Sequence, residues 1–98
     1  MQIQDNPART RFEAIEGDNV AFAAYALAGD TITFTHTIVP EAMRGKGVAT
    51  ALIRAALASA RQRGLRVTPR CPFFLAYMKQ HRDDDDLLSP EGCALVAS

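Results

Sequence analysis

The stretch of this sequence best suited to chemistry is residues 39–49, where a predicted strand ends and a predicted long helix begins. The first turn of a helix leaves main-chain N–H groups without partners, at the positive end of the helix dipole. Gly45 and Gly47 let a ligand approach that backbone closely, and Arg44 and Lys46 add positive charge. The loop therefore predicts an anion site suited to a phosphate or pyrophosphate.

Two phosphate-binding motifs can be tested against this loop, and neither fits. The P-loop requires Ser or Thr after its lysine, but Gly47 follows Lys46. The dinucleotide-binding motif requires a third glycine where Thr50 stands. The pattern that does fit is Arg-x-x-Gly-x-Ala, formed by Arg44, Gly47 and Ala49.

Three side chains outside the loop have types suited to catalysis. His36 lies on the predicted strand 31–39, and alternation places it on the same face as the apolar side chains of that strand. Histidine titrates near neutral pH and is a common general base, although on an apolar face it is often a hydrogen-bonded core residue. Both interpretations of His36 stay open at this point.

Cys71 and Tyr77 also have two interpretations each. Cys71 is either a small buried hydrophobe or, near the start of a predicted helix, a nucleophile with His36 as its base. Tyr77 either packs its helix against the sheet or donates a proton, since an ordinary tyrosine is protonated at neutral pH.

The candidate residues are positioned by a short series of predicted strands and helices. Strands are predicted over residues 11–16, 20–28, 31–39 and 65–68, and helices over residues 48–63 and 73–81. The order β-β-β-α-β-α predicts an α+β domain with a mostly antiparallel four-stranded sheet and two helices. Residues 1–98 are expected to form a single domain with its core at about residues 10–82. We expect residues 1–9 to be an irregular arm and the acidic tail, residues 83–98, to be peripheral.

Composition excludes several classes of protein. The 98 residues carry 11 basic and 11 acidic side chains, so the basic excess of a nucleic-acid-binding protein is missing. No apolar run is long enough to span a membrane, and no signal peptide is visible. Two cysteines without a matching histidine set make a poor metal site, and the aspartates of residues 83–86 read as a solvated acidic end that could attract a basic acceptor. We expect a cytoplasmic protein with no metal, either a monomer or a weak homo-oligomer.

The glycine-loop motif and its surroundings resemble the GNAT superfamily of acyl-coenzyme A-dependent N-acyltransferases, in its compact stand-alone form. The resemblance also rests on residues 36–40, 71–74 and Tyr77, and it covers about residues 12–81. It implies transfer of an acetyl group from acetyl-coenzyme A to an amine. It further implies that the coenzyme A pyrophosphate lies on the loop amides, which belong to Arg44, Gly45, Lys46, Gly47, Val48 and Ala49.

The resemblance also implies roles near the thioester. The pantetheine arm would pair with backbone near Ile38 and Val39, and the Val39 amide would polarise the thioester carbonyl. Tyr77 would bind the cofactor and protonate the departing thiolate, and His36 or water would remove the proton of the amine. The alternative function is a coenzyme A-binding or interaction module without turnover, favoured by the absence of an obvious carboxylate base and of acceptor-side elements.

Overall fold

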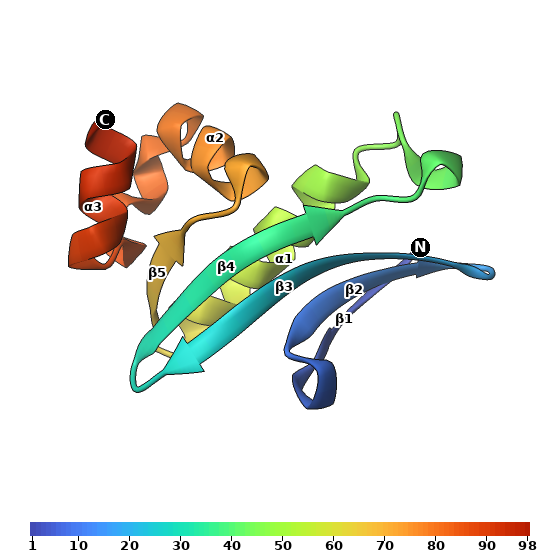
Figure 1. Cartoon of the computed structure of the whole chain (residues 1–98), viewed down its shortest axis with the longest axis horizontal. Helices are drawn as coiled ribbons and strands as arrows, with labels where there is room; N and C mark the ends of the chain where they lie inside the picture. Colours follow the sequence, from blue (N-terminus) through green and yellow to red (C-terminus); the bar gives the residue numbers. More distant parts are fainter.

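A computed structural model describes all 98 residues, and it contains one mixed sheet with helices (Figure 1). The strands are β1 (Gln2–Asn6), β2 (Arg11–Glu16), β3 (Asn19–Ala28), β4 (Thr31–Ile38) and β5 (Arg66–Pro69). They follow one another across the sheet in chain order, antiparallel except for the parallel pair β4–β5. The predicted α+β fold with a mostly antiparallel sheet is confirmed, with five strands in place of four.

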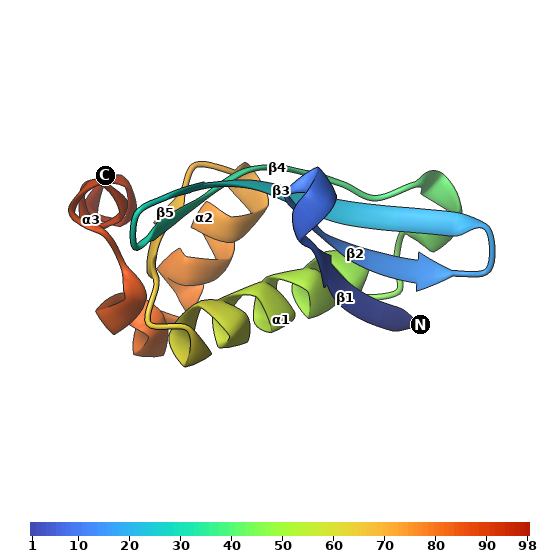
Figure 2. The ribbon, with the colours of Figure 1, turned by 90° about the horizontal axis from the view of Figure 1, so that it is seen from below.

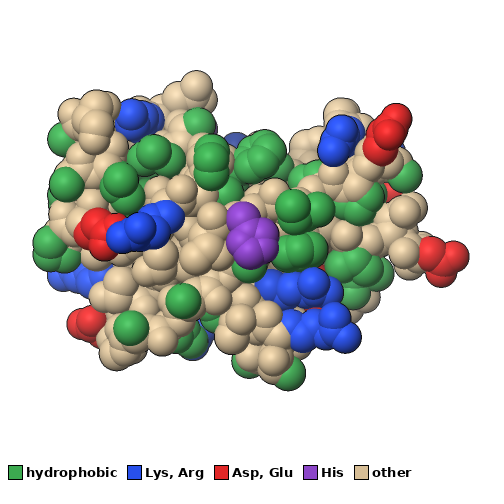
Figure 3. Space-filling model, in the orientation of Figure 1, with side chains coloured by type: hydrophobic (Ala, Val, Ile, Leu, Met, Phe, Trp, Pro, Cys, Tyr) green, Lys and Arg blue, Asp and Glu red, His purple; other side chains and the backbone are tan.

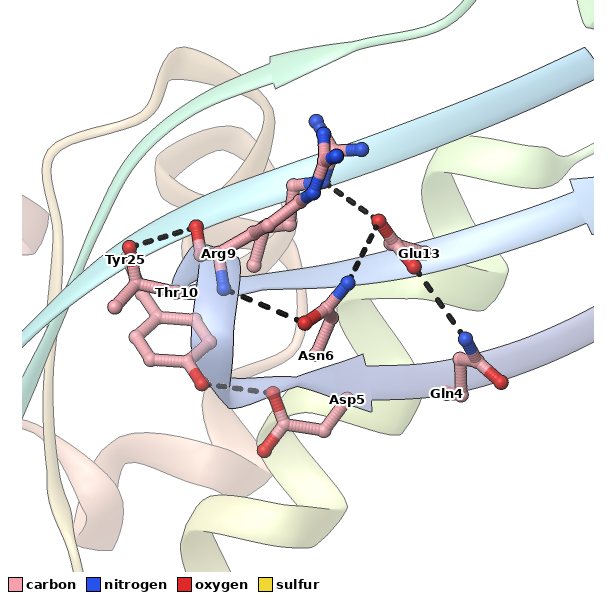
Figure 4. Close-up of polar contacts among 8 residues, drawn as sticks. Gln4, Asp5, Asn6, Arg9, Thr10, Glu13 and Tyr25 are labelled. Atoms are coloured by element: carbon pink, nitrogen blue, oxygen red, sulfur yellow. Dashed lines mark hydrogen bonds and ion pairs between the residues drawn. The ribbon is translucent and has the colours of Figure 1, made fainter.

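The additional strand is β1, so the prediction of an irregular arm over residues 1–9 was wrong. Gln2 to Asn6 pairs along the whole of β2, and a short 3-10 helix, Pro7–Arg9, turns the chain into that strand. The Tyr25 hydroxyl of β3 donates to the Asp5 carboxylate at 2.7 Å (Figure 4). Burial and that carboxylate raise the pKa of Tyr25 to about 12. The sequence of β1 gives no sign of a strand, because only Ile3 in it is apolar and the strand depends on contacts with β2 and β3.

Two helices cover one face of the sheet and leave the opposite face, here called the open face, uncovered (Figure 2). They are α1 (Val48–Gln62) and α2 (Pro72–Gln80). Residues at helical spacing form the buried stripe of α1, and proline at the first turn suits the start of α2. Phe34 of β4 stacks on Phe74 of α2, with ring centroids 4.1 Å apart, at the centre of the core.

The chain after residue 82 is part of this core, which corrects the prediction of a peripheral tail. A 3-10 helix (Arg82–Leu87) leads into α3 (Pro90–Ala97), which packs beside β5 and α2. Leu87, Leu88 and Val96 are buried. The aspartates are also engaged, because Arg61 of α1 donates to Asp84 and Asp86 at 2.7–3.1 Å. The four aspartates led to the whole of residues 83–98 being treated as an acidic tail, although the residues that follow them include apolar side chains that pack in the core.

Replacing Gly92 with alanine is expected to destabilise the domain. A Cβ at this position of α3 would lie 2.6 Å from the main-chain oxygen of Val67 in β5, so the helix must shift. We expect the free energy of unfolding in urea to fall by about 1–3 kcal/mol. The exposed neighbour is the control, and Cys93→Ala should change that free energy by less than about 0.5 kcal/mol. Equal stabilities for the two variants would contradict the packing of α3 on β5.

A β-bulge in β4 alters the direction of the side chains that follow it. Tyr25 pairs with Phe34 and Ala24 with His36, so Thr35 is an extra residue. As a result Thr37 is buried at 8% exposure while His36 and Ile38 are exposed. The prediction that His36 and Ile38 share the core face of Phe34 was therefore wrong, because strict alternation ends at the bulge.

Candidate active site

The glycine loop presents an uninterrupted row of free main-chain donors. Gly45 and Gly47 have φ of +78° and +72°, a left-handed conformation that glycine adopts without strain. Gly47 caps α1 without any side-chain hydrogen bond, and the first N–H of the region with a main-chain acceptor is that of Ala51. The N–H groups of residues 45–50 have no acceptor in the protein. This arrangement offers an anion several hydrogen bonds at the positive end of the helix dipole.

These donors border an open hollow of about 410 Å³, here called the first hollow. Both loop glycines have open space where a Cβ would be, so the backbone itself is accessible from the hollow. The hollow extends from the loop along the end of β4 to the start of α2. Its lining residues are Thr37, Ile38, Val39, Met43, Arg44, Gly45, Gly47, Val48, Ala49 and Phe73.

The two basic side chains of the loop have different surroundings. Arg44 lines the hollow, and its Nε donates to the main-chain oxygen of Val39 at 3.1 Å. Lys46 is not among the lining residues, since its Nζ donates to Glu16 at the end of β2 at 2.9 Å. This contact holds the pKa of the Glu16 carboxyl below its usual range. The loop's cation beside the hollow is therefore Arg44.

The edge of β4 is free where it borders the hollow. Its ladder with β5 ends at the pair Phe34–Pro69, and the Cys71 N–H then donates to the Phe34 oxygen at 2.8 Å. Beyond this point β4 has no partner on the β5 side, and the Val39 N–H has no main-chain acceptor. An extended ligand can therefore add to this edge as another strand would.

The open face of the sheet around His36 is aromatic and polar. Figure 3 shows a histidine in the middle of this face, next to hydrophobic and basic side chains. The His36 ring lies edge-on to Phe22, with centroids 5.9 Å apart, and its Nδ1 is 3.1 Å from the Thr35 hydroxyl. The guanidinium carbon of Arg11 lies over the Phe22 ring, 4.4 Å from the ring centroid. His36 is thus accessible from solvent, on the strand that also borders the first hollow.

A buried carboxylate lies beside this surface. Glu13 of β2 is 5% exposed and accepts hydrogen bonds from Arg11, Asn6 and Gln4 (Figure 4). The hydrogen bond from Arg11 is the main cause that keeps the pKa of the Glu13 carboxyl below its usual range, and burial opposes it. All hydrogen-bonding partners of Glu13 are neighbours on the sheet, so its role is to join β1 to β2.

The structure does not bring His36, Cys71 and Tyr77 together. Cys71 is fully buried on the helix-covered face, with its Sγ 3.2 Å from the Thr37 hydroxyl. Tyr77 lines a second hollow of about 210 Å³ between α1 and α2, and its ring stacks on His81. Each of the three predicted catalytic side chains therefore has a separate environment.

Sequence reasoning missed three residues that line the first hollow. Thr37 was assigned to the face opposite the core, and the bulge that buries it leaves no signal in a run of alternating threonines. Met43 is fully buried in a 3-10 helix, Glu41–Met43, that was predicted as loop. Phe73 entered the sequence analysis only within residues 71–74 and was given no site role, but half of it is exposed at the mouth of the hollow.

The structure contains neither a cluster of metal-ligating side chains nor a membrane-spanning helix. No three His, Cys, Asp or Glu side chains lie close enough together to hold a metal ion. None of the helices combines the length and the apolar character needed to cross a bilayer.

Comparison with known proteins identifies the family to which this domain belongs. The family model described as GCN5-related N-acetyltransferase matches residues 11–87, from the start of β2 to the end of the last 3-10 helix. The chain belongs to the GCN5-related N-acetyltransferase family. Members of this family, the GNAT proteins, transfer acetyl groups to amines of small molecules or proteins.

The solved structure of another protein has the same fold as this GNAT chain. It is the NMR solution structure of a Staphylococcus aureus protein described as GCN5-like, with a TM-score of 0.70 and 22% sequence identity. The match covers 90% of this chain and 87% of the other. No curated protein matches the sequence at a significant level.

Proposed function

We propose that this GNAT protein is an N-acetyltransferase that uses acetyl-coenzyme A and acts on an amine. The observation that carries the proposal is the row of unpartnered N–H groups at residues 45–50, beside an open hollow. A diphosphate satisfies several such donors at once, and the guanidinium of Arg44 adds a charge of opposite sign. The left-handed glycines and the space over them fit a ligand that touches the backbone directly.

The rest of the cofactor fits the free edge of β4. A pantetheine arm carries amide groups that pair with main-chain groups near Ile38 and Val39, as an added strand would. The Val39 N–H, which has no main-chain acceptor, is the donor that would polarise the thioester carbonyl. Phe73, which is half exposed at the mouth of the hollow, supplies apolar surface to the methylene groups of the arm.

We propose direct transfer with His36 as the general base. The amine nitrogen attacks the thioester carbon, the C–S bond breaks, and the electron pair leaves with sulfur as a thiolate. His36 accepts the proton that the amine loses, and the thiolate is protonated in turn. His36 suits this role because it is exposed on the face from which an acceptor can approach, one residue before Thr37, which lines the hollow.

An acyl-cysteine intermediate is less well supported by the position of Cys71. Its thiol is fully buried, contacts Thr37, and is not among the residues that line the first hollow. A nucleophile must reach the thioester carbon and have its base within hydrogen-bond distance. No hydrogen bond joins Cys71 to His36.

Cys71→Ala is accordingly expected to keep most of the activity. We expect kcat within about threefold of the wild type, since direct transfer does not use the thiol. The assay is release of coenzyme A thiol, with the exposed Cys93→Ala as the matched control. A loss of about a thousandfold in kcat for Cys71→Ala alone, with the fold intact by circular dichroism, would establish the covalent route instead.

The second candidate function is a module that binds coenzyme A without turnover. No carboxylate lines the first hollow, which is the observation in its favour. Titration calorimetry with acetyl-coenzyme A tests for binding, and thiol release with polyamines, peptides and aminoglycosides tests for transfer. Binding without any acceptor-dependent thiol release favours the module, and absence of binding contradicts both functions.

A further inference from the structure

Three residues form a row across the open face, and the proposed reaction uses only one of them. Arg11 of β2 pairs with Ala24 of β3, and Ala24 pairs in turn with His36 of β4. Residues that are directly opposite one another in a ladder point to the same face of the sheet. Two strand spacings separate the Cα atoms of Arg11 and His36 by about 10 Å. The residue between them contributes only a methyl group, so the row has a cation at one end and the proposed base at the other.

The guanidinium of Arg11 is held in place at its end of the row. Its Nε donates to the buried Glu13 carboxylate at 2.7 Å, and its central carbon lies 4.4 Å from the Phe22 ring centroid. The two terminal nitrogens have no hydrogen-bond partner in the protein, and 21% of the side chain is exposed. Arg11 therefore keeps a pair of N–H donors from which a carboxylate can accept in bidentate fashion.

The Phe22 ring lies between this guanidinium and the imidazole. It contacts Arg11 through its face and His36 edge-on, with the two ring centroids 5.9 Å apart. Both polar groups are thus within reach of one small molecule that lies on the ring. An amine hydrogen-bonded to the imidazole and a carboxylate on the guanidinium are then joined by a chain of a few carbon atoms, whose methylene groups contact the aromatic surface.

The charges of this surface favour an acceptor with a negative group over a polycation. Glu13, which is opposite Phe22 in the ladder, is only 5% exposed and already accepts three hydrogen bonds. In Figure 3 the prominent acidic side chains lie toward the ends of this face, away from the histidine. The aspartates that were expected to attract a basic acceptor are largely engaged, because Asp84 and Asp86 bind an arginine of α1. A polyamine therefore finds no free carboxylate in this part of the sheet, whereas an anionic group finds a guanidinium.

We propose that the acceptor is a small free amino acid, an amine that carries a carboxylate a few carbon atoms away; this rests on the proposed function. The carboxylate binds the terminal nitrogens of Arg11, the methylene groups contact Phe22, and the amine is placed beside His36. Arg11 is then the residue that determines specificity for the acceptor. The surface offers one cation and one base a short distance apart, which matches a small bifunctional molecule better than a peptide chain.

The experiment compares glycine, β-alanine and γ-aminobutyrate with their amides as acceptors, by release of coenzyme A thiol at fixed pH and ionic strength. Each amide has the length of its acid but lacks the negative charge. We expect wild-type kcat/KM to be about tenfold higher for at least one acid than for its amide, mainly through KM. Equal values in all three pairs would overturn the inference and leave the proposed function intact. Absence of thiol release with these amines and with polyamines and aminoglycosides would contradict both.

Two variants test whether the preference depends on Arg11. Glu13→Gln keeps the guanidinium, and a glutamine oxygen can still accept from its Nε, so this variant should keep the preference for the acid. The double variant Glu13→Gln with Arg11→Gln removes the guanidinium without leaving a buried carboxylate unpaired, and acids and amides should then react equally. Both proteins should bind acetyl-coenzyme A as the wild type does, which checks that they are folded. A preference that persists in the double variant would overturn the role of Arg11.

A peptide that begins with aspartate tests the size of the acceptor. Its terminal amine and side-chain carboxylate have the same spacing as those of β-alanine. We expect its kcat/KM to be no higher than that of the best free amino acid. A value about tenfold above that of every free amino acid would show that the acceptor is a peptide and would overturn the proposal.

Discussion

Gly47→Glu is expected to abolish binding of acetyl-coenzyme A, with an affinity at least about a hundredfold below that of the wild type. The substitution places a carboxylate among the free N–H groups of residues 45–50, where it repels a diphosphate and competes for the same donors. Nothing lies within 4 Å of a Cβ at this position, so the side chain itself meets no obstacle. Titration calorimetry with acetyl-coenzyme A measures the effect.

The matched control for this variant is Gly47→Ala. Both substitutions carry the strain of a non-glycine residue at a φ of +72°, roughly 1–2 kcal/mol, but alanine adds no charge. We expect Gly47→Ala to bind acetyl-coenzyme A within about tenfold of the wild type. If Gly47→Glu binds as tightly as Gly47→Ala, the loop does not hold the diphosphate.

His36→Gln is expected to lower kcat by about a hundredfold to ten-thousandfold while acetyl-coenzyme A binds with unchanged affinity. The glutamine keeps a polar side chain at the bulge but cannot accept the proton of the amine. Thiol release at saturating acceptor measures kcat, and titration calorimetry with acetyl-coenzyme A measures the affinity.

The second histidine provides the matched control. His81 lies at the end of α2 against Tyr77, away from β4, so His81→Gln should keep the kcat of the wild type. A His36→Gln variant with wild-type kcat would mean that water, or another group, removes the proton.

Local pattern was sufficient for most of the fold of this GNAT chain. The threonine-rich strand β4, the apolar stripe of α1, and the prolines that end β5 and begin α2 all have short-range signals. The two ends of the chain lacked such signals. β1 depends on its pairing with β2 and on the bond from Tyr25 to Asp5, and α3 depends on its packing against β5.

The part of the candidate site that is formed by main-chain N–H groups could be predicted from the sequence. Two glycines before a helix directly indicate free donors, and the structure places that loop at the mouth of a hollow. Side-chain directions were harder to predict, because the extra residue Thr35 in β4 reverses every direction after it. Ion pairs were equally hidden, as Lys46 reaches Glu16 on a strand far earlier in the sequence. These features arise from tertiary contacts that no short stretch encodes.

The role of the glycine loop is tested most directly by following the amide resonances of the protein by NMR during titration with coenzyme A. We expect the largest changes at the N–H groups of residues 45–50, which gain phosphate acceptors that they do not have in the free protein. If coenzyme A binds while these resonances stay where they are and changes occur elsewhere, the central claim about the glycine loop is contradicted.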